Sequence, residues 1–331
     1  MHSLFASLRL VYAPVSNLDA DKLLTDDKAR EWLDRAKIYM IGARKELAFS
    51  NVQINDDDVV EFDVGNGEVS VRGAIDPEVV IRTLSFEVKT IAVGEEKGQQ
   101  RGAELWVIVT DKAGRQVPII RLTPDFFLWK VSHGAPGVSI SGNFSELNTF
   151  DLLYIGMSQD SAFKRLVENP HEARLKILTN ELCRSASGRL SKEITFFFFD
   201  VEPLYLSTFG AEDEIDDAAV QMMVDHEKQI PKRSIVDDAE KAFIKVLGTP
   251  YNKRRYKQYP AVANGLRQSI LSKYSYAIDE DLTFRVDQLE IVGAFGRGMP
   301  FADHADFILI DGEDVKFVDV SANGVTDFVN E

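Results

Sequence analysis

Two apolar stretches decide how the middle of this chain folds: residues 150–157 read FDLLYIGM, and residues 193–206 read EITFFFFDVEPLYL. Both are short and rich in aromatic and β-branched residues, which is typical of strands. The four consecutive phenylalanines of the second stretch place apolar side chains on both faces, so we expect a strand covered on both sides. Residues 161–184 lie between them and have helical spacing with a break at Pro170. The pattern predicts a strand, a helical segment and a second strand.

The next helix is expected over residues 237–247, DDAEKAFIKVL. Glu240 lies on the same face as Phe243, Ile244 and Leu247, at i, i+3, i+4 and i+7. A carboxylate on an apolar face is costly to bury unless a cation or a metal ion accompanies it. Glu240 is therefore either a residue at the rim of the apolar face or a metal ligand.

A basic and aromatic segment follows this helix, because residues 253–260 read KRRYKQYP. Cationic side chains that alternate with aromatic rings suit a phosphate backbone and the faces of bases or sugars. The other interpretation is a solvated loop that balances an acidic protein. This segment is called the basic loop below, and its cations are Lys253, Arg254, Arg255 and Lys257.

Two motifs in this part of the chain resemble the GIY-YIG nuclease superfamily, in particular the form found in the incision subunit of bacterial nucleotide-excision repair. The first motif is Tyr154-Ile155-Gly156 at the end of a strand, followed by Arg165 on a helix. The second is EKAFIKVLGTPYN over residues 240–252, a helix with a glutamate and then a Pro-Tyr-Asn turn. The resemblance covers residues 150–260, about a third of the chain.

The resemblance implies a metal-dependent DNA endonuclease that hydrolyses phosphodiester bonds. Glu240 would hold Mg²⁺ or Mn²⁺, Arg165 would steady the scissile phosphate, Tyr154 would orient or deprotonate the attacking water, and Asn252 would shape the site. His171 is either a general base or a residue at the start of a helix. The four cations of the basic loop would bind the DNA backbone at the edge of the site. A hard cation held by one carboxylate, with water and phosphate oxygens completing its shell, is chemically sufficient.

The family also has a tyrosine on the strand that precedes the Tyr-Ile-Gly strand. We expect residues 126–131, FFLWKV, to form that strand, with Phe127 or Trp129 in the place of the tyrosine. Because neither side chain can exchange a proton, a second function stays open: a non-catalytic module that binds nucleic acid or protein on a degenerate nuclease fold.

The expected fold class is α/β (α+β), in three consecutive regions. Residues 1–125 form an N-terminal α+β region with a helix over 20–48 and a mostly antiparallel sheet over 59–131, and this region is a candidate for substrate recognition. Residues 126–260 form the GIY-YIG-like domain, with a central mixed or antiparallel sheet flanked by helices. Residues 261–331 form a C-terminal β subdomain.

A competing nuclease pattern lies in that last region. Asp306 followed by Asp314-Val315-Lys316 superficially matches the D…(D/E)xK pattern of restriction-type nucleases. The Asp-Gly turn at 311–312 favours a simple β-hairpin instead.

Composition limits the other possibilities. The chain has 331 residues, 45% hydrophobic and 27% charged, which excludes disordered and fibrous classes. Its net charge of −15 repels phosphate, so DNA must meet a local basic patch. One cysteine, Cys183, cannot form an intrachain disulfide, and a reducing cytoplasm is expected. We expect no signal peptide, no membrane span and no membrane partner.

Overall fold

A computed structural model gives the structure of the chain, and it describes residues 2–82, 90–95, 104–110, 115–169, 172–182, 192–208, 230–261, 265–296, 304–322 and 324–328. The architecture is mixed α+β. The chain divides into two compact units, and the first is discontinuous in sequence. Unit 1 combines Met1–Arg44 with Phe150–Glu331, and unit 2 is Lys45–Thr149.

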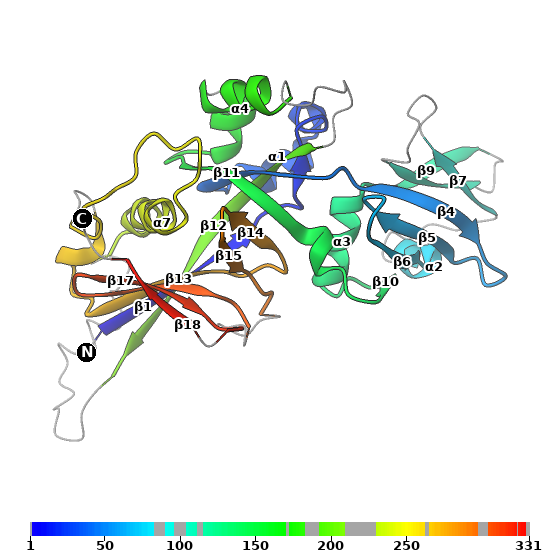
Figure 1. The fold of residues 1–331 in the computed structure, drawn as a ribbon. Coiled ribbons are helices and arrows are strands. Elements are labelled where there is room, and N and C mark those ends of the chain that lie inside the picture. The colour runs from blue at the N-terminus through cyan, green and yellow to red at the C-terminus, as the bar shows by residue number, and fades with distance from the viewer. Residues whose placement is uncertain are drawn as a thin grey trace, which may run out of the picture. The chain divides into compact units, whose positions relative to one another are not determined.

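Unit 1 is built on an 11-stranded mixed sheet (Figure 1). The strand order is β15-β14-β11-β3-β12-β1-β13-β16-β17-β18, and β2 pairs with β12. The long strand β12 is antiparallel to both β3 and β1, whereas β1 and β13 are parallel. The strands are β1 (His2–Leu10), β2 (Val15–Ser16), β3 (Ile38–Arg44), β11 (Thr149–Met157), β12 (Glu193–Ser207), β13 (Lys273–Ile278), β14 (Thr283–Val286), β15 (Leu289–Val292), β16 (Phe307–Asp311), β17 (Asp314–Asp319) and β18 (Gly324–Asp327).

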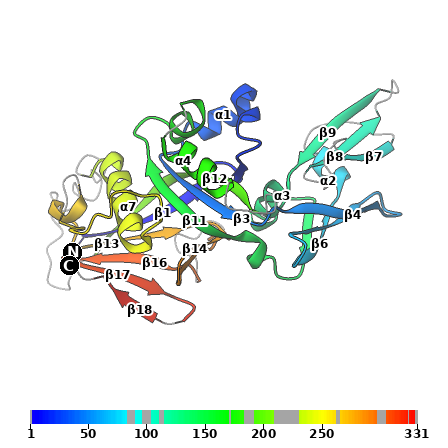
Figure 2. The same ribbon diagram turned by 45° about the horizontal axis from the view of Figure 1, so that its top comes forward.

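Short helices accompany this sheet. They are η1 (Lys22–Thr25), α1 (Asp27–Leu33), η3 (Lys164–Glu168), α4 (Glu172–Leu182), α7 (Lys232–Leu247) and η4 (Leu266–Gln268), and Figure 2 shows α4 and α7 from a second direction. Helix α7 ends at Gly248, whose φ of 57° lets its N–H bond back to the Ile244 carbonyl oxygen at 3.0 Å. The helix expected over 237–247 is therefore confirmed, with an earlier start at Lys232.

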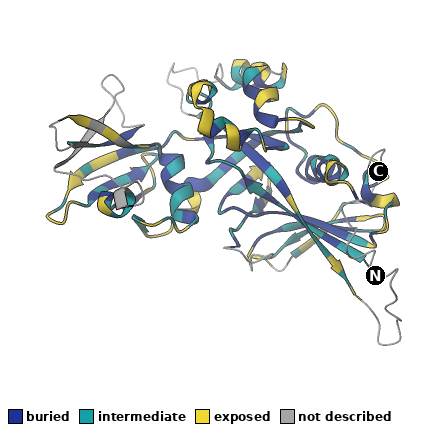
Figure 3. Cartoon of the chain, turned by 180° about the vertical axis from the view of Figure 1, so that it is seen from behind, coloured by how far each residue is buried: buried dark blue, intermediate teal, exposed yellow. Residues whose placement is uncertain are grey.

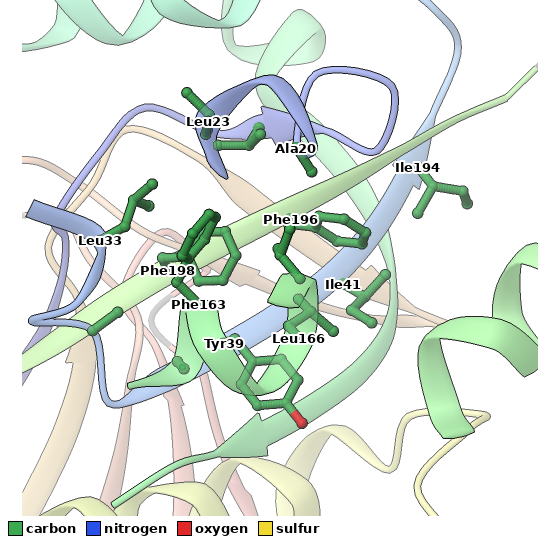
Figure 4. Close-up of a cluster of buried hydrophobic side chains, with 14 of the residues drawn as sticks. Ala20, Leu23, Leu33, Tyr39, Ile41, Phe163, Leu166, Ile194, Phe196 and Phe198 are labelled. Carbon is green, nitrogen blue, oxygen red and sulfur yellow. The ribbon is translucent and has the colours of Figure 1, made fainter. Parts of the chain in front are cut away.

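The phenylalanine run of β12 is buried on both faces, as expected. Phe196 and Phe198 pack into a cluster that also contains Tyr39, Phe163 and Leu166 (Figure 4). On the opposite face, Phe197 lies edge-on to two rings of neighbouring strands, at centroid distances of 4.7 and 4.8 Å, from Phe150 and Phe284 respectively. Strand β3 is buried at all seven positions, while α1 and α4 carry exposed side chains (Figure 3).

Unit 2 contains two smaller antiparallel sheets, ordered β10-β6-β5-β4 and β7-β8-β9. Its core centres on Phe62 and Phe127, whose ring centroids lie 4.9 Å apart. Its elements are β4 (Ala48–Ile54), β5 (Val60–Gly65), β6 (Ser70–Ile75), α2 (Pro77–Arg82), β7 (Thr90–Glu95), β8 (Leu105–Thr110), β9 (Gln116–Leu122), α3 (Pro124–Ser132), β10 (Val138–Ser141) and η2 (Ser145–Asn148).

Two secondary-structure expectations are wrong. Of the helix expected over 20–48, the structure contains only the short helices η1 and α1, and residues 38–44 form β3. All seven residues of β3 are buried, and a strand buried on both faces has no alternating pattern that distinguishes it from a helix. Residues 126–131 lie in helix α3, where the Thr123 hydroxyl accepts a hydrogen bond from the Phe126 N–H at 3.3 Å and Pro124 occupies the first turn.

The boundaries of the two units differ from the domain boundaries expected near residues 125 and 260. Residues 1–44 pair with strands from the middle of the chain, and β13 joins the large sheet beside β1. Strands after residue 260 extend that sheet and do not form one of the two compact units by themselves. In the described part of the chain, no helix is long and apolar enough to cross a membrane.

Candidate functional site

Strands β3 and β11 bring two tyrosines together in unit 1. The strands are antiparallel, with Tyr39 opposite Gly156 and Tyr154 opposite Ile41. Paired residues share a face of the sheet, and so do residues two apart on one strand, so both rings lie on the same face. Their centroids are 5.9 Å apart with an interplanar angle of 30°. Tyr39 therefore lies on the strand that pairs with the Tyr-Ile-Gly strand, whereas Phe127 and Trp129 lie on helix α3.

Gly156 makes this arrangement of rings feasible. A Cβ atom at residue 156 would lie 2.5 Å from Cζ of Tyr39 and 2.8 Å from Cε1 of Tyr154. Both distances are far below van der Waals contact, so any side chain here would displace both rings. The glycine of the Tyr-Ile-Gly motif is thus required by packing.

The two hydroxyls lie in different surroundings. Tyr39 is fully buried, and its hydroxyl interacts with the Tyr154 hydroxyl. Burial raises the pKa of Tyr39 strongly, and the neighbouring Tyr154 raises it further. Tyr154 is half-buried, and burial also raises its pKa. Figure 4 shows the Tyr39 hydroxyl pointing away from the labelled apolar side chains.

Arg165 supplies positive charge to the same site. It lies on η3 and its side chain is exposed. Its charge lowers the pKa of Tyr39 and Tyr154, opposing the effect of burial, and therefore acts on both hydroxyls. A backbone hydrogen bond of 3.0 Å from Ala162 to the Ala36 carbonyl oxygen holds the start of this helical segment next to the entry of β3.

Glu240 lies on α7 and faces these groups. Its pKa is raised from 4.5 to about 7, first by burial and then by the negative charge of Asp237, while the positive charges of Lys241 and Arg165 act in the opposite direction. A hydrogen bond from the Met157 backbone N–H also lowers the pKa of Glu240, so its carboxylate lies at the end of β11. The charge of Glu240 in turn raises the pKa of Tyr39 and Tyr154. The structure therefore brings Tyr154, Arg165 and Glu240 together, with Tyr39 added.

Asn252 joins the turn after α7 to the Tyr-Ile-Gly strand. Its Oδ1 accepts a hydrogen bond from the Ile155 N–H at 2.9 Å, and its Nδ2 donates to the Ile155 carbonyl oxygen at 2.8 Å. The Thr249 hydroxyl also donates to Oδ1. Next to it, the Tyr251 N–H donates to the Leu153 carbonyl oxygen at 3.1 Å. Asn252 is buried, so its amide positions the site by holding the backbone.

The basic loop lies beside the same helix. Its four cations are exposed. Lys245 on α7 donates to the Lys257 carbonyl oxygen at 3.0 Å, and Lys253 forms an exposed ion pair with Glu172 at 3.0 Å. The Arg254 guanidinium lies 5.6 Å from the centroid of the Tyr256 ring.

Tyr256 connects this loop to Glu240. Burial raises the pKa of Tyr256, and the charges of Glu240 and Asp237 raise it further. The basic loop therefore borders the carboxylate site. His171 falls outside the described residues.

Sequence reasoning missed Tyr39, although a signal was present. Residues 37–42 read KIYMIG, an Ile-Tyr pair within an apolar run of the kind that forms buried strands. A partner strand close in sequence to residue 150 was expected, but the whole of unit 2 separates β3 from β11.

The competing restriction-type pattern has a structural explanation. Asp306 is buried and accepts hydrogen bonds from the backbone N–H groups of Val292 and Val320, at 2.7 and 2.9 Å. Asp314 is exposed at the mouth of the β16–β17 hairpin, opposite Asp311. The hairpin interpretation is confirmed.

Among the residues that the structure describes, no three side chains of His, Cys, Asp or Glu gather in a group that could hold a metal ion. A hard cation bound by one or two carboxylates needs no such group, because water and phosphate oxygens complete its shell. The half-buried Glu240 carboxylate, with the Tyr39 hydroxyl nearby, fits such a cation. Comparison with known proteins found no matching family model and no similar curated protein or solved structure.

Proposed function

We propose that this chain is a metal-dependent DNA endonuclease with a GIY-YIG-like site formed by Tyr39, Tyr154, Arg165 and Glu240. The observation that carries the proposal is that Glu240, from a helix far along the chain, interacts with both tyrosines and with Arg165. These are the residue types that phosphodiester hydrolysis needs at one place: an anionic cation ligand, a fixed positive charge and hydroxyls that orient water.

Each side chain has a role that follows from its surroundings. Glu240 would hold Mg²⁺ or Mn²⁺, which when bound neutralises phosphate charge and makes water more acidic. Arg165 is exposed and free to turn toward a non-bridging phosphate oxygen. Because their pKa values are raised, both tyrosines keep their protons at neutral pH. Tyr154, the more exposed of the two, would orient the attacking water.

Substrate binding is assigned to the basic loop. An acidic protein needs a local cationic surface to hold DNA, and this loop borders Glu240 through Tyr256. Its exposed cations would contact backbone phosphates on either side of the scissile bond. The Asn252 hydrogen bonds to Ile155 support this assignment, since they hold the residue directly before the loop at the site.

A cleavage assay tests the proposal. The full chain is incubated with plasmid, linear and branched DNA in Mg²⁺, in Mn²⁺ and in excess chelator, beside Glu240→Gln and the control Glu31→Gln on the exposed face of α1. We expect cation-dependent cleavage that Glu240→Gln reduces by roughly a thousandfold and Glu31→Gln leaves unchanged. Cleavage by Glu240→Gln at the parent rate would contradict the proposal. DNA binding without any cleavage would favour the non-catalytic alternative.

A further inference from the structure

Asp238 on α7 is a fully buried carboxylate that the proposed reaction does not use. Its Oδ1 accepts hydrogen bonds from the hydroxyls of Tyr259 and Tyr276, at 2.5 and 2.8 Å, and its Oδ2 accepts one from the Leu266 N–H at 2.7 Å. Both tyrosines are also fully buried. A buried carboxylate is costly, and a buried polar network whose members are hydrogen-bonded holds its elements in one arrangement. Asp238 therefore fixes α7 to the segments that carry its three donors.

The three donors come from two different parts of unit 1. Tyr276 lies in β13, within the large sheet. Tyr259 and Leu266 lie on the segment that follows α7, and Tyr259 is the penultimate residue of the basic loop. Asn252, directly before the loop, is hydrogen-bonded to the backbone of Ile155. The basic loop is thus anchored at both ends, to β11 at its start and to α7 at its end, and these two elements carry candidate site residues.

Between these anchors, the backbone of the loop has a strained conformation. Tyr256 has a φ of 43°, in the left-handed region that a bulky side chain rarely adopts. Such strain persists only where the surrounding structure over-determines the conformation, and strained residues cluster at active sites and in ligand-binding loops. The Tyr259 N–H donates to the Tyr256 carbonyl oxygen at 2.8 Å. Lys245 on α7 donates to the Lys257 carbonyl oxygen at 3.0 Å. The conformation of the loop therefore depends on Tyr259 and on α7.

We infer that Asp238 is a positioning residue for DNA binding: the hydrogen bond that it accepts from Tyr259 holds the basic loop in the conformation in which its cations contact the DNA backbone beside Glu240. This inference rests on the DNA binding that the proposed function assigns to the loop. A loop that is already held in its bound conformation loses less conformational entropy when DNA binds. The Tyr259 hydrogen bond therefore contributes to affinity as well as to stability, whereas the Tyr276 hydrogen bond, which comes from the sheet, contributes to stability alone.

Two matched variants separate these contributions. Tyr259→Phe and Tyr276→Phe each remove one hydroxyl from the same carboxylate oxygen and leave a fully buried ring in place. The affinity of the full chain for labelled DNA is measured by fluorescence anisotropy in excess chelator, and urea denaturation measures the stability of each variant. We expect similar losses of stability. Tyr259→Phe should weaken DNA binding by about tenfold, and Tyr276→Phe by less than about twofold.

Hydrogen–deuterium exchange of the basic loop is a second measurement, which needs no DNA. In Tyr259→Phe, the backbone amides of residues 253–258 should exchange faster than in the parent chain, because the end of the loop has lost its hydrogen bond to α7. In Tyr276→Phe, the same amides should exchange at the parent rate.

Equal DNA affinities for the two variants, or unchanged exchange of the loop in Tyr259→Phe, would overturn the inference and show that Asp238 only stabilises the fold. Failure of the parent chain to bind DNA would also overturn it. The cleavage assay described above decides the proposed function separately. A parent chain that binds DNA without cleaving it, and whose affinity falls in Tyr259→Phe alone, would support the inference and contradict the proposed nuclease activity.

Discussion

At the scale of single residues, the site depends on a glycine that leaves space for two tyrosine rings and on a carboxylate that is partly buried. Tyr39 and Tyr154 approach over Gly156 because that residue has no side chain to separate them. Glu240 is kept partly buried between like charge from Asp237 and opposite charge from Arg165. A carboxylate in such surroundings is destabilising when ionised, as is common for groups retained for chemistry.

The raised pKa of Glu240, about 7 against an ordinary 4.5, predicts how stability depends on pH. The Glu240 carboxyl group loses its proton near pH 4.5 in the unfolded chain and near pH 7 in the folded chain. Between these values the folded state binds more protons, so the contribution of Glu240 to stability falls as pH rises and stays low above pH 7. Without divalent cations, Glu240→Gln should therefore be more stable than the parent at pH 8, by about 1–3 kcal/mol, and equally stable near pH 4.

Chemical denaturation in chelator at the two pH values measures this difference in the free energy of unfolding. Glu31→Gln, on the exposed face of α1, controls for the loss of a charge. A Glu240→Gln variant that is less stable than the parent at pH 8 would show that the carboxylate is a structural group with a good partner.

At the scale of elements, local sequence patterns predicted the helices and strands that local contacts determine. The strand at 150–157 and the helix that carries Glu240 are both present, because each has a clear period and a clear end. Strand β3 was not predicted, since a segment buried on both faces lacks an alternating pattern. The position of Tyr39 beside Tyr154 follows from its register opposite Gly156, and no sequence pattern near residue 39 contains that register.

The turn after α7 depends on hydrogen bonds between Asn252 and a strand that lies far away in the sequence. Removing its amide leaves the N–H and carbonyl oxygen of the buried Ile155 without partners. Asn252→Ala should therefore lower the free energy of unfolding by about 2–4 kcal/mol. The neighbouring Lys253→Ala loses only an exposed ion pair and should cost about 0.5 kcal/mol or less. Urea denaturation of both variants measures the difference, and equal stabilities would remove the structural role of Asn252.

At the scale of the whole molecule, unit 2 is inserted between the two strands that carry the tyrosines. The strands diverge where Ala43 pairs with Asp151, so the insertion leaves from the end of a β-hairpin. Loop-closure entropy rises slowly with loop length, and long insertions at such ends are tolerated. This explains why the three consecutive regions expected from sequence differ from the two units.

The overall charge of −15 makes the basic loop decisive for DNA binding. If its cations contact phosphates, each lost contact lowers the slope of log affinity against log salt by nearly one unit. Arg254→Ala with Arg255→Ala should weaken binding across DNA sequences and flatten the slope by about one to two units. The control is Lys28→Ala with Arg35→Ala, which removes two exposed cations near α1.

Fluorescence anisotropy across a salt series, with labelled DNA of several sequences, measures both quantities. If the loop variant and the control have the same affinity and slope, the loop only balances acidic surface and DNA must be held elsewhere.

The central claim is that Tyr39, which precedes unit 2 in the chain, acts in the same site as Glu240. Tyr39→Phe tests it most directly, because it removes only the hydroxyl and leaves the buried aromatic ring in place. The measurement is the Mg²⁺-dependent cleavage rate of this variant relative to the parent, at saturating DNA. We predict a loss of about a hundredfold or more in a fully folded protein. A Tyr39→Phe variant that cleaves at the parent rate would contradict the account.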